Sequence, residues 1–320
     1  MKRILLIFFT LFFSFQTSFA QKDSQFSNNG FNNIIHNPAY LGVNNKWNVS
    51  GLFRKQWIGL KGNSSISSFS LDFPFRIIRS HHGFGISFTK DEFGDDLKLK
   101  NTSVSLKYAI KANVLEGTFS FGISGCFVNQ DFKGKGNIST LIDKSFRRFL
   151  ANEMIKGDGN FDETNLIFDL GLGMFYTKNK YYFGLSINHL TTPSFFKTDN
   201  YEMKLKRQYN ISAGLTYSIS NRWELAPSVF AASDLDFYQV TGGVNCIFDK
   251  SYWIGMMYRQ DDALGINIGI EFKNGMKFAY AYDLGVSEFS KKSNGSHELI
   301  GTYSFDIKIN KQKYSSVRFL

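Results

Sequence analysis

The feature that most constrains this chain is the alternation of apolar residues with small or polar residues at a period of two. From Leu264 to Phe272 every second residue is apolar, and the residues between them are glycine, asparagine or glutamate. Successive side chains of a β-strand point to opposite faces of the sheet, so this period predicts a strand and not a helix. The pattern recurs at 103–111, 181–188 and 209–219. We therefore expect an all-β fold.

The polar faces of these strands favour a transmembrane antiparallel β-barrel over a soluble β-sandwich. A sandwich exposes its polar face to water and normally fills it with charges, whereas the polar faces here are rich in Gly and Ser. The strands also run about 9–14 residues, which suits a tilted membrane span and is long for a sandwich. Aromatic residues make up 17% of the chain, with 35 Phe against 4 Pro, and they fit outward faces and interfacial belts.

The first twenty residues predict a secretory signal peptide. Lys2 and Arg3 form a positive start, 4–15 is an uncharged apolar run, and Ala20 ends a small-residue cleavage site before Gln21. This segment is too short for a spanning helix, and no later segment has the ~18 consecutive apolar residues that such a helix needs. If the exported chain meets a membrane, it therefore does so as a barrel, because an open sheet leaves backbone groups unpaired in lipid.

Fourteen segments carry the strand pattern, and an even number is what closure of an antiparallel bacterial barrel requires. They divide the chain into a signal peptide (1–20), a periplasmic or lumenal N-terminal segment (21–46), the barrel (47–309) and a C-terminal tail (310–320). The strands are expected near 47–54, 65–73, 82–90, 98–110, 117–131, 164–177, 181–190, 205–219, 222–232, 236–248, 251–260, 263–273, 275–284 and 297–308.

The connections between these strands differ in length according to whether they follow an even-numbered or an odd-numbered strand. Tight turns follow strands six, eight, ten and twelve, at 178–180, 220–221, 249–250 and 274–275. Long connections follow strands five, seven and thirteen, at 132–163, 191–204 and 285–296. Short turns face the periplasm and long loops face outside in this class, so we expect a periplasmic N-terminus. Apolar residues at helical spacing within 140–155 also predict a short helix in the longest loop.

The net charge narrows the choice of binding partners, and the spacing of the cysteines argues against a disulfide framework or a zinc site. The formal net charge is +10, or about +8 once Lys2 and Arg3 leave with the signal peptide (10 − 2). A basic balance can indicate nucleic acid binding, but export argues against it, and anionic lipid headgroups or an acidic protein are the better candidates. Cys126 and Cys246 have no disulfide or zinc spacing, so we expect free, packed thiols.

Several short motifs follow one another in a characteristic order along the mature chain. They are Gln25-Phe26, Asn37-Pro38-Ala39-Tyr40-Leu41-Gly42, Phe53-Arg54-Lys55-Gln56-Trp57-Ile58-Gly59, Leu225-Ala226-Pro227-Ser228, Tyr252-Trp253-Ile254-Gly255, Tyr258-Arg259, and Tyr280 to Asp283 followed by Gly295-Ser296-His297-Glu298. In these motifs the chain resembles the PorP/SprF family, outer-membrane proteins of the type IX secretion and gliding machinery of Bacteroidota. His36, before Asn37, departs from the family pattern, and so does the continuation of the chain at 311–320.

The resemblance implies a barrel of about fourteen strands at the cell surface that docks, exports or anchors a specific secreted adhesin through its C-terminal signal domain. It also implies outer-membrane lipid and periplasmic type IX secretion components as partners, and no enzymatic activity. Nucleic acid is not an expected partner. The alternative is an outer-membrane channel for hydrophobic or small solutes, which predicts an open lumen or a lateral opening.

The family motifs also suggest residues for partner binding or for a plug: Asn37, Pro38, Ala39, Tyr40, Arg54, Gln56, Trp57 and Gly59. For the segment that starts at Asn37, a simple turn and a plug contact both stay open. Arg54 has the parity of Ser50, so we expect it to face the lumen and to pair with a carboxylate such as Asp72 or with an acid of the cargo. Trp57 is expected in an interfacial belt.

No catalytic, cofactor or metal site is predicted. His297-Glu298 begins like a zinc-protease motif, but Gly301 replaces the second histidine and the segment alternates as a strand. The pair His81-His82 is interpreted as part of a loop. The acidic pairs at 95–96 and 261–262 are interpreted as solvated loop charges, with calcium binding in a surface loop left open. The chain also has no phosphate-binding loop and no nucleophile elbow.

Overall fold

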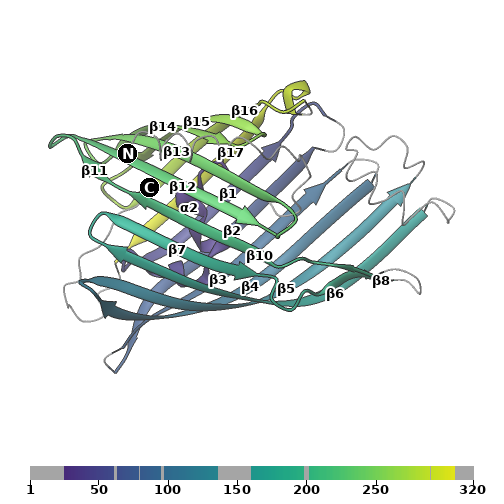
Figure 1. Ribbon diagram of the computed structural model, residues 1–320, viewed down its shortest axis with the longest axis horizontal. Helices are drawn as coiled ribbons and strands as arrows, with labels where there is room; N and C mark the ends of the chain where they lie inside the picture. The colour runs from purple at the N-terminus through teal and green to yellow at the C-terminus, as the bar shows by residue number, and fades with distance from the viewer. Residues whose placement is uncertain are drawn as a thin grey trace, which may run out of the picture.

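A computed structural model describes residues 25–60, 63–78, 80–94, 97–135, 160–197, 202–288 and 290–306. Its main element is a closed antiparallel barrel of fourteen strands, as expected (Figure 1). β10 and β11 are two parts of one strand, interrupted at Thr216. The strands are β1 (Trp47–Gln56), β2 (Ser64–Ile77), β3 (Ser80–Phe93), β4 (Leu97–Val114), β5 (Gly117–Lys135), β6 (Asn160–Lys178), β7 (Tyr181–Asn188), β10 (Gln208–Leu215) with β11 (Tyr217–Ser218), β12 (Trp223–Ser233), β13 (Tyr238–Phe248), β14 (Tyr252–Arg259), β15 (Ala263–Glu271), β16 (Met276–Gly285) and β17 (Ser296–Phe305).

Neighbouring strands in the barrel follow one another in the sequence, except at the one contact that closes the barrel. β1 pairs with β17, the first strand with the last, and β10 pairs with both β7 and β12. This order is what hairpin connections produce, because each strand pairs with the one before it. The register is continuous, so side chains alternate strictly between the lumen and the outer surface.

The outer surface is apolar and the lumenal surface is polar. In β14 the side chains of Tyr252, Ile254, Met256 and Tyr258 are each half or more exposed, while the alternate residues, from Trp253 to Arg259, are buried in the lumen. Large apolar side chains exposed in this number are unfavourable in water but favourable against lipid. Among the described residues, no helix is long and apolar enough to cross a membrane.

The two ends of the barrel differ. At one end, the tight-turn end, neighbouring strands are joined by short turns, such as those at 179–180 and 249–251. At the other, the long-loop end, the connections include 286–295 with the 3₁₀ helix η3 (Ser290–Lys292) and 189–207. The second of these contains a small sheet of β8 (Ser194–Lys197) and β9 (Glu202–Lys204) that the sequence pattern did not indicate.

Other expectations have different outcomes. His81 and His82 lie within β3, so their loop interpretation is wrong; the strand pairs through them with β2 and β4. Cys126 and Cys246 are free thiols within β5 and β13. The signal peptide at 1–20, the helix expected at 140–155, the acidic pair at 95–96 and the tail at 310–320 lie outside the described residues.

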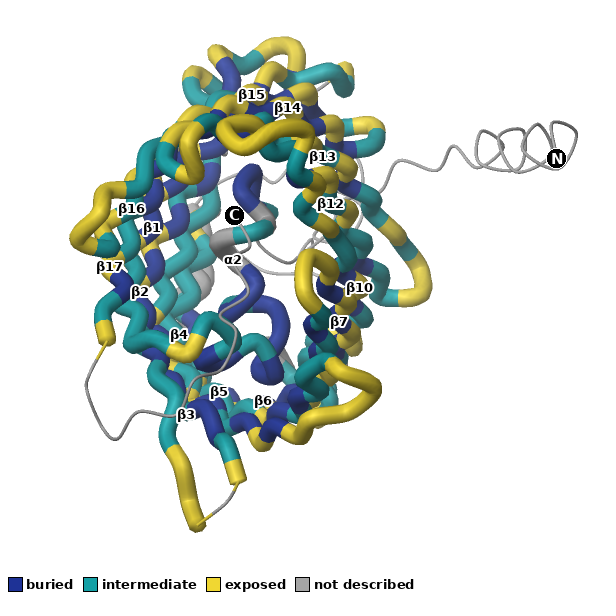
Figure 2. The backbone as a smooth tube through the Cα atoms, turned by 90° about the vertical axis from the view of Figure 1, so that its left-hand side faces the viewer, coloured by how far each residue is buried: buried dark blue, intermediate teal, exposed yellow. Residues whose placement is uncertain are grey.

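The lumen holds the N-terminal segment Gln25–Asn45, which we call the N-terminal plug. It contains a two-turn helix, α2 (Asn29–His36), and the 3₁₀ helix η1 (Pro38–Tyr40). Figure 2 shows α2 and the buried stretches that follow it inside the ring of strands. Ala39 and Leu41 have no exposed surface. The helix was not expected, because an eight-residue helix gains most of its stability from packing and not from its own sequence.

Candidate functional site in the barrel lumen

Arg54 is the centre of a charge cluster on the lumenal wall. The alternation of β1 turns its side chain inward, as expected, and leaves it with no exposed surface. Its Nη2 lies 2.9 Å from Oδ2 of Asp283 and its Nη1 lies 3.3 Å from Oε2 of Glu298. The expected partner Asp72 is therefore wrong. The reason is the closure of the barrel, which pairs β1 with β17 and sets Arg54 directly opposite Glu298.

Arg259 completes this cluster from β14. Its Nη1 lies 3.4 Å from Oδ2 of Asp283 and 2.9 Å from Oδ2 of Asp262. We call Arg54, Arg259, Asp283 and Glu298 the charge clamp; each side chain is at most 2% exposed. Two cations and two anions balance, which makes the burial of four charges tolerable. Asp262 is thus an ion-pair partner and not a solvated loop charge.

The charge clamp binds the start of the N-terminal plug. The backbone N–H groups of Ser27 and Asn28 donate to the two carboxylate oxygens of Glu298, at 2.8 and 2.9 Å. The Ser27 hydroxyl donates to Asp283 at 2.7 Å and accepts from Arg54. The Phe26 carbonyl accepts from Arg259 at 2.7 Å. These groups lie just before α2, where a carboxylate is favourable against the helix dipole.

The end of α2 is held by groups of the opposite kind. Lys107 on β4 donates to the Ile34 carbonyl, and the His36 carbonyl accepts from Ser186 at 2.8 Å and from Asn188 at 3.2 Å. The last carbonyls of a helix lack partners within the helix and carry its negative end. A carboxylate at the start and a lysine at the end therefore fix the direction in which the helix lies.

The family segment after the helix is both a turn and a contact with the wall. Asn37 accepts from the Ala39 N–H at 2.9 Å through its side chain. The same side chain donates to the carbonyls of Met174 and Leu185, at 3.0 and 3.1 Å. The Tyr40 ring meets Phe175 edge-on, with ring centroids 5.2 Å apart. The segment that starts at Asn37 is therefore both a turn and a plug contact, the two possibilities that the sequence left open.

Glycines in the wall make room for this segment. A Cβ atom at Gly122 on β5 would collide with the backbone of Pro38 and Ala39, and one at Gly173 on β6 would collide with the Asn37 side chain. Side chains at these positions would push the plug off the wall, because native packing leaves no spare space. The plug then leaves the lumen at the tight-turn end, where the Gly42 N–H donates to Asp72 at 2.8 Å and its carbonyl accepts from Lys111.

The remaining family-motif residues lie at the long-loop end beside the clamp. Gln56 is buried and points inward. Trp57 has a φ of +55° and its backbone N–H donates to the Ser296 hydroxyl at 3.1 Å. It lines a small crevice with Arg259 and Asp283, so its expected place in an outward belt is wrong. Gly59 follows at a φ of +87°.

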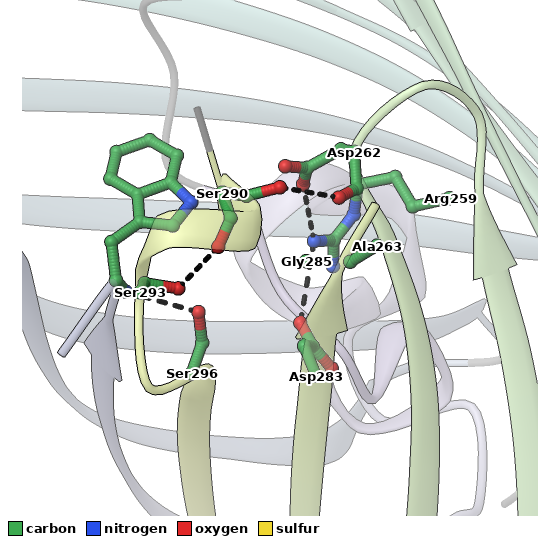
Figure 3. Close-up of a pocket in the computed structure, with 9 residues that line it drawn as sticks. Arg259, Asp262, Ala263, Asp283, Gly285, Ser290, Ser293 and Ser296 are labelled. Atoms are coloured by element: carbon green, nitrogen blue, oxygen red, sulfur yellow. Dashed lines mark hydrogen bonds and ion pairs between the residues drawn. The ribbon is translucent and has the colours of Figure 1, made fainter. Parts of the chain in front are cut away.

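This crevice lies between the charge clamp and the loop at 286–295. Figure 3 shows Ser290, Ser293 and Ser296 on one side and Arg259 with its carboxylates on the other. The Ser290 hydroxyl donates to the Asp262 carbonyl at 3.0 Å. The loop therefore covers the clamp from the long-loop end. Within the described residues, no group of histidine, cysteine and carboxylate side chains could hold a metal ion.

Arg259, Asp283 and Glu298 were not selected as site residues from the sequence, although all three lie in the family motifs. Their strand parity was the available signal. Each occupies an inward position of its strand, flanked on the outer face by apolar residues such as Tyr258 and Leu299. A charge at an inward position within a membrane span needs a partner, so the carboxylates Asp283 and Glu298 could have been proposed as partners of the two arginines.

Comparisons with known proteins agree with a membrane barrel. The family described as "Type IX secretion system membrane protein PorP/SprF" matches residues 18–303. No curated protein sequence matches the chain. Among solved structures, the toluene transporter TbuX of Ralstonia pickettii is similar, with 10% identity, a TM-score of 0.52, and coverage of 85% of this chain and 92% of that chain. The toluene transporter TodX of Pseudomonas putida is similar with 12% identity, a TM-score of 0.50, and coverage of 88% and 94%. At such identities the likeness concerns the fold alone.

Proposed function

We propose, because the chain belongs to the PorP/SprF family of type IX secretion system membrane proteins, that it docks, exports or anchors a specific surface adhesin through the C-terminal signal domain of that adhesin. The family and the fold make the protein an outer-membrane β-barrel of this secretion system. Its family and its structural relatives are outer-membrane barrels and channels and not enzymes.

The observation that carries the docking proposal is the occupied lumen. The N-terminal plug is bound at three places along its length: at the charge clamp, at Lys107 and β7, and at Asp72. A barrel that works as a pore needs an open path, whereas one that works as a docking platform needs only its surfaces. The occupied lumen therefore supports an interaction protein over a channel with an open lumen.

The two ends of the barrel suit different partners. The long-loop end presents β4, β5 and β6, of 18, 19 and 19 residues, next to β7 of eight residues. Strands of such unequal length rise above their neighbours, and their outer ends carry charges such as Lys98, Lys100 and Asp131. This raised polar edge is a surface for a secreted domain, and the tight-turn end is the surface for periplasmic components.

Deletion of the gene tests this function. We expect loss of one large adhesin from the cell surface, restored by the intact chain, and recovery of that adhesin with the barrel after mild detergent extraction. Recovery of the barrel alone together with unchanged surface display would contradict the proposal. Loss of uptake of a hydrophobic solute with normal display would instead support the channel alternative.

A further inference from the structure

Two adjacent tight turns end in exposed apolar side chains. Ile78, in the turn between β2 and β3, is 93% exposed, and Leu115, in the turn between β4 and β5, is 81% exposed. β3 and β4 pair as far as His81 opposite Lys111, so the two turns lie beside each other at the tight-turn end. We call Ile77, Ile78, Val114 and Leu115 the tip patch.

The backbone at these turns does not favour the residues that occupy it. Ile78 has a φ of +56° and Leu115 a φ of +49°. Left-handed φ values disfavour bulky L-residues, and β-branched ones most of all. The other turns at this end of the barrel that need a positive φ use Asn179, Asp249 with Lys250, or Gly275, most of which suit that conformation. The turn geometry therefore does not explain an isoleucine and a leucine, which points to a role for their side chains.

The outer faces of the strands identify what covers the tip patch. On β4 the outward side chains Ile110 and Val114 are 44% and 43% exposed, and Ile77 on β2 is 50% exposed. The apolar outward side chains of β2 and β4 thus continue to the ends of these two strands, while β3 between them has Ser80 and His82 at its outward positions. At the opposite ends of β3 and β4 the outward residues are charged, as at Lys90 and Lys98. A surface that is continuous with the lipid-facing band is expected to contact lipid as that band does.

We propose that the tip patch is buried in the membrane leaflet at the tight-turn end, where Ile78 and Leu115 anchor the barrel in phospholipid. Apolar side chains at the headgroup boundary bind by burying their area among the acyl chains. The partner is lipid and not a protein, and the contact is independent of the proposed role in secretion. It makes the β2–β5 side of the barrel the deeper side at this leaflet.

Site-directed spin labelling tests the anchor with the whole barrel in phosphatidylethanolamine and phosphatidylglycerol vesicles. Cys126→Ser and Cys246→Ser provide the background, and single cysteines replace Ile78 or Leu115. Asn179→Cys and Asp249→Cys are matched controls in other tight turns. We expect oxygen to reach the labels at 78 and 115 better than a water-soluble nickel chelate does, with the reverse order at the controls. Equal chelate access at all four positions overturns the proposal.

A second pair of variants separates anchoring from turn folding. Ile78→Asn and Leu115→Asn place a residue that tolerates positive φ, so the turns themselves become easier to form. We expect both variants to lower the midpoint of thermal unfolding in vesicles while leaving it unchanged or higher in detergent micelles. An equal or raised midpoint in both media overturns the lipid contact. Immobilisation of water-exposed labels only when a periplasmic extract is added also overturns it, in favour of a protein partner.

Discussion

At the scale of the residue, Arg54 shows how burial determines the contribution of an ion pair to stability. It contacts Asp283, Glu298 and Ser27 with no exposed surface of its own. On β3, Lys90 and Glu92 form an ion pair of 2.6 Å, but both side chains are more than 40% exposed. Water screens the second pair and not the first.

This contrast predicts the outcome of two substitutions. Arg54→Ala leaves two buried carboxylates with one cation, and we expect it to lower the free energy of unfolding by about 3–5 kcal/mol. Lys90→Ala should change it by at most about 1 kcal/mol. Urea unfolding of the barrel in vesicles, followed by Trp fluorescence, measures both. An equal loss of unfolding free energy in the two variants would show that the charge clamp stabilises the barrel no more than an exposed ion pair does.

Parity predicted the inward direction of Arg54 but not its partner. Asp72 also points inward, and it binds Gly42 and Asn48 instead. The choice between inward carboxylates depends on which strand meets β1 when the barrel closes, and on the plug, whose Ser27 joins the cluster. A strand pattern contains neither fact, because both arise from contacts between residues more than two hundred positions apart.

At the scale of the element, the N-terminal plug depends on small residues in the wall beneath it. Gly122 and Gly125 lie on the same strand, β5, but on opposite faces. A Cβ at Gly122 would meet the plug backbone, whereas a Cβ at Gly125 would meet the Phe168 ring at 3.6 Å, an ordinary contact. The two positions thus form a matched pair for the same substitution.

We expect Gly122→Ala to displace η1 and to destabilise the barrel by about 1–3 kcal/mol, as overpacking does. Gly125→Ala should be neutral or nearly so. Limited proteolysis of the barrel in detergent, read by mass spectrometry for cleavage within 25–45, distinguishes plug displacement from general loosening. If both variants resist cleavage equally, the small residue at Gly122 does not determine where the plug lies against the wall.

Strands were the predictable elements and the plug was not. The fourteen strands follow from the alternation because lipid on one side and a polar lumen on the other impose two faces on every span. Residues 25–45 lack the alternation of a strand, and α2, at eight residues, is too short for its own spacing to predict it. Asn37 and Pro38 were singled out by resemblance alone, and the short helix before them is held by Glu298 and Lys107 rather than by its own composition.

At the scale of the whole molecule, the parity of the connections predicts a direction for the barrel in the membrane. With long loops outside, Lys292 in η3 is expected to face the medium and Asn179 to face the periplasm. In a background of Cys126→Ser and Cys246→Ser, a membrane-impermeant maleimide should label Lys292→Cys on intact cells and Asn179→Cys only after permeabilisation. The opposite order of labelling would invert the orientation.

The charge clamp joins the two ends of the chain across the closing seam of the barrel. Arg54 lies on the first strand, Glu298 lies on the last, and both contact Ser27. The segment synthesised first is therefore held by the strands synthesised last. A barrel missing β16 and β17 has neither Asp283 nor Glu298 and lacks the contacts that hold the start of the plug, so binding of Ser27 and Asn28 to the wall requires that the last strands are in place.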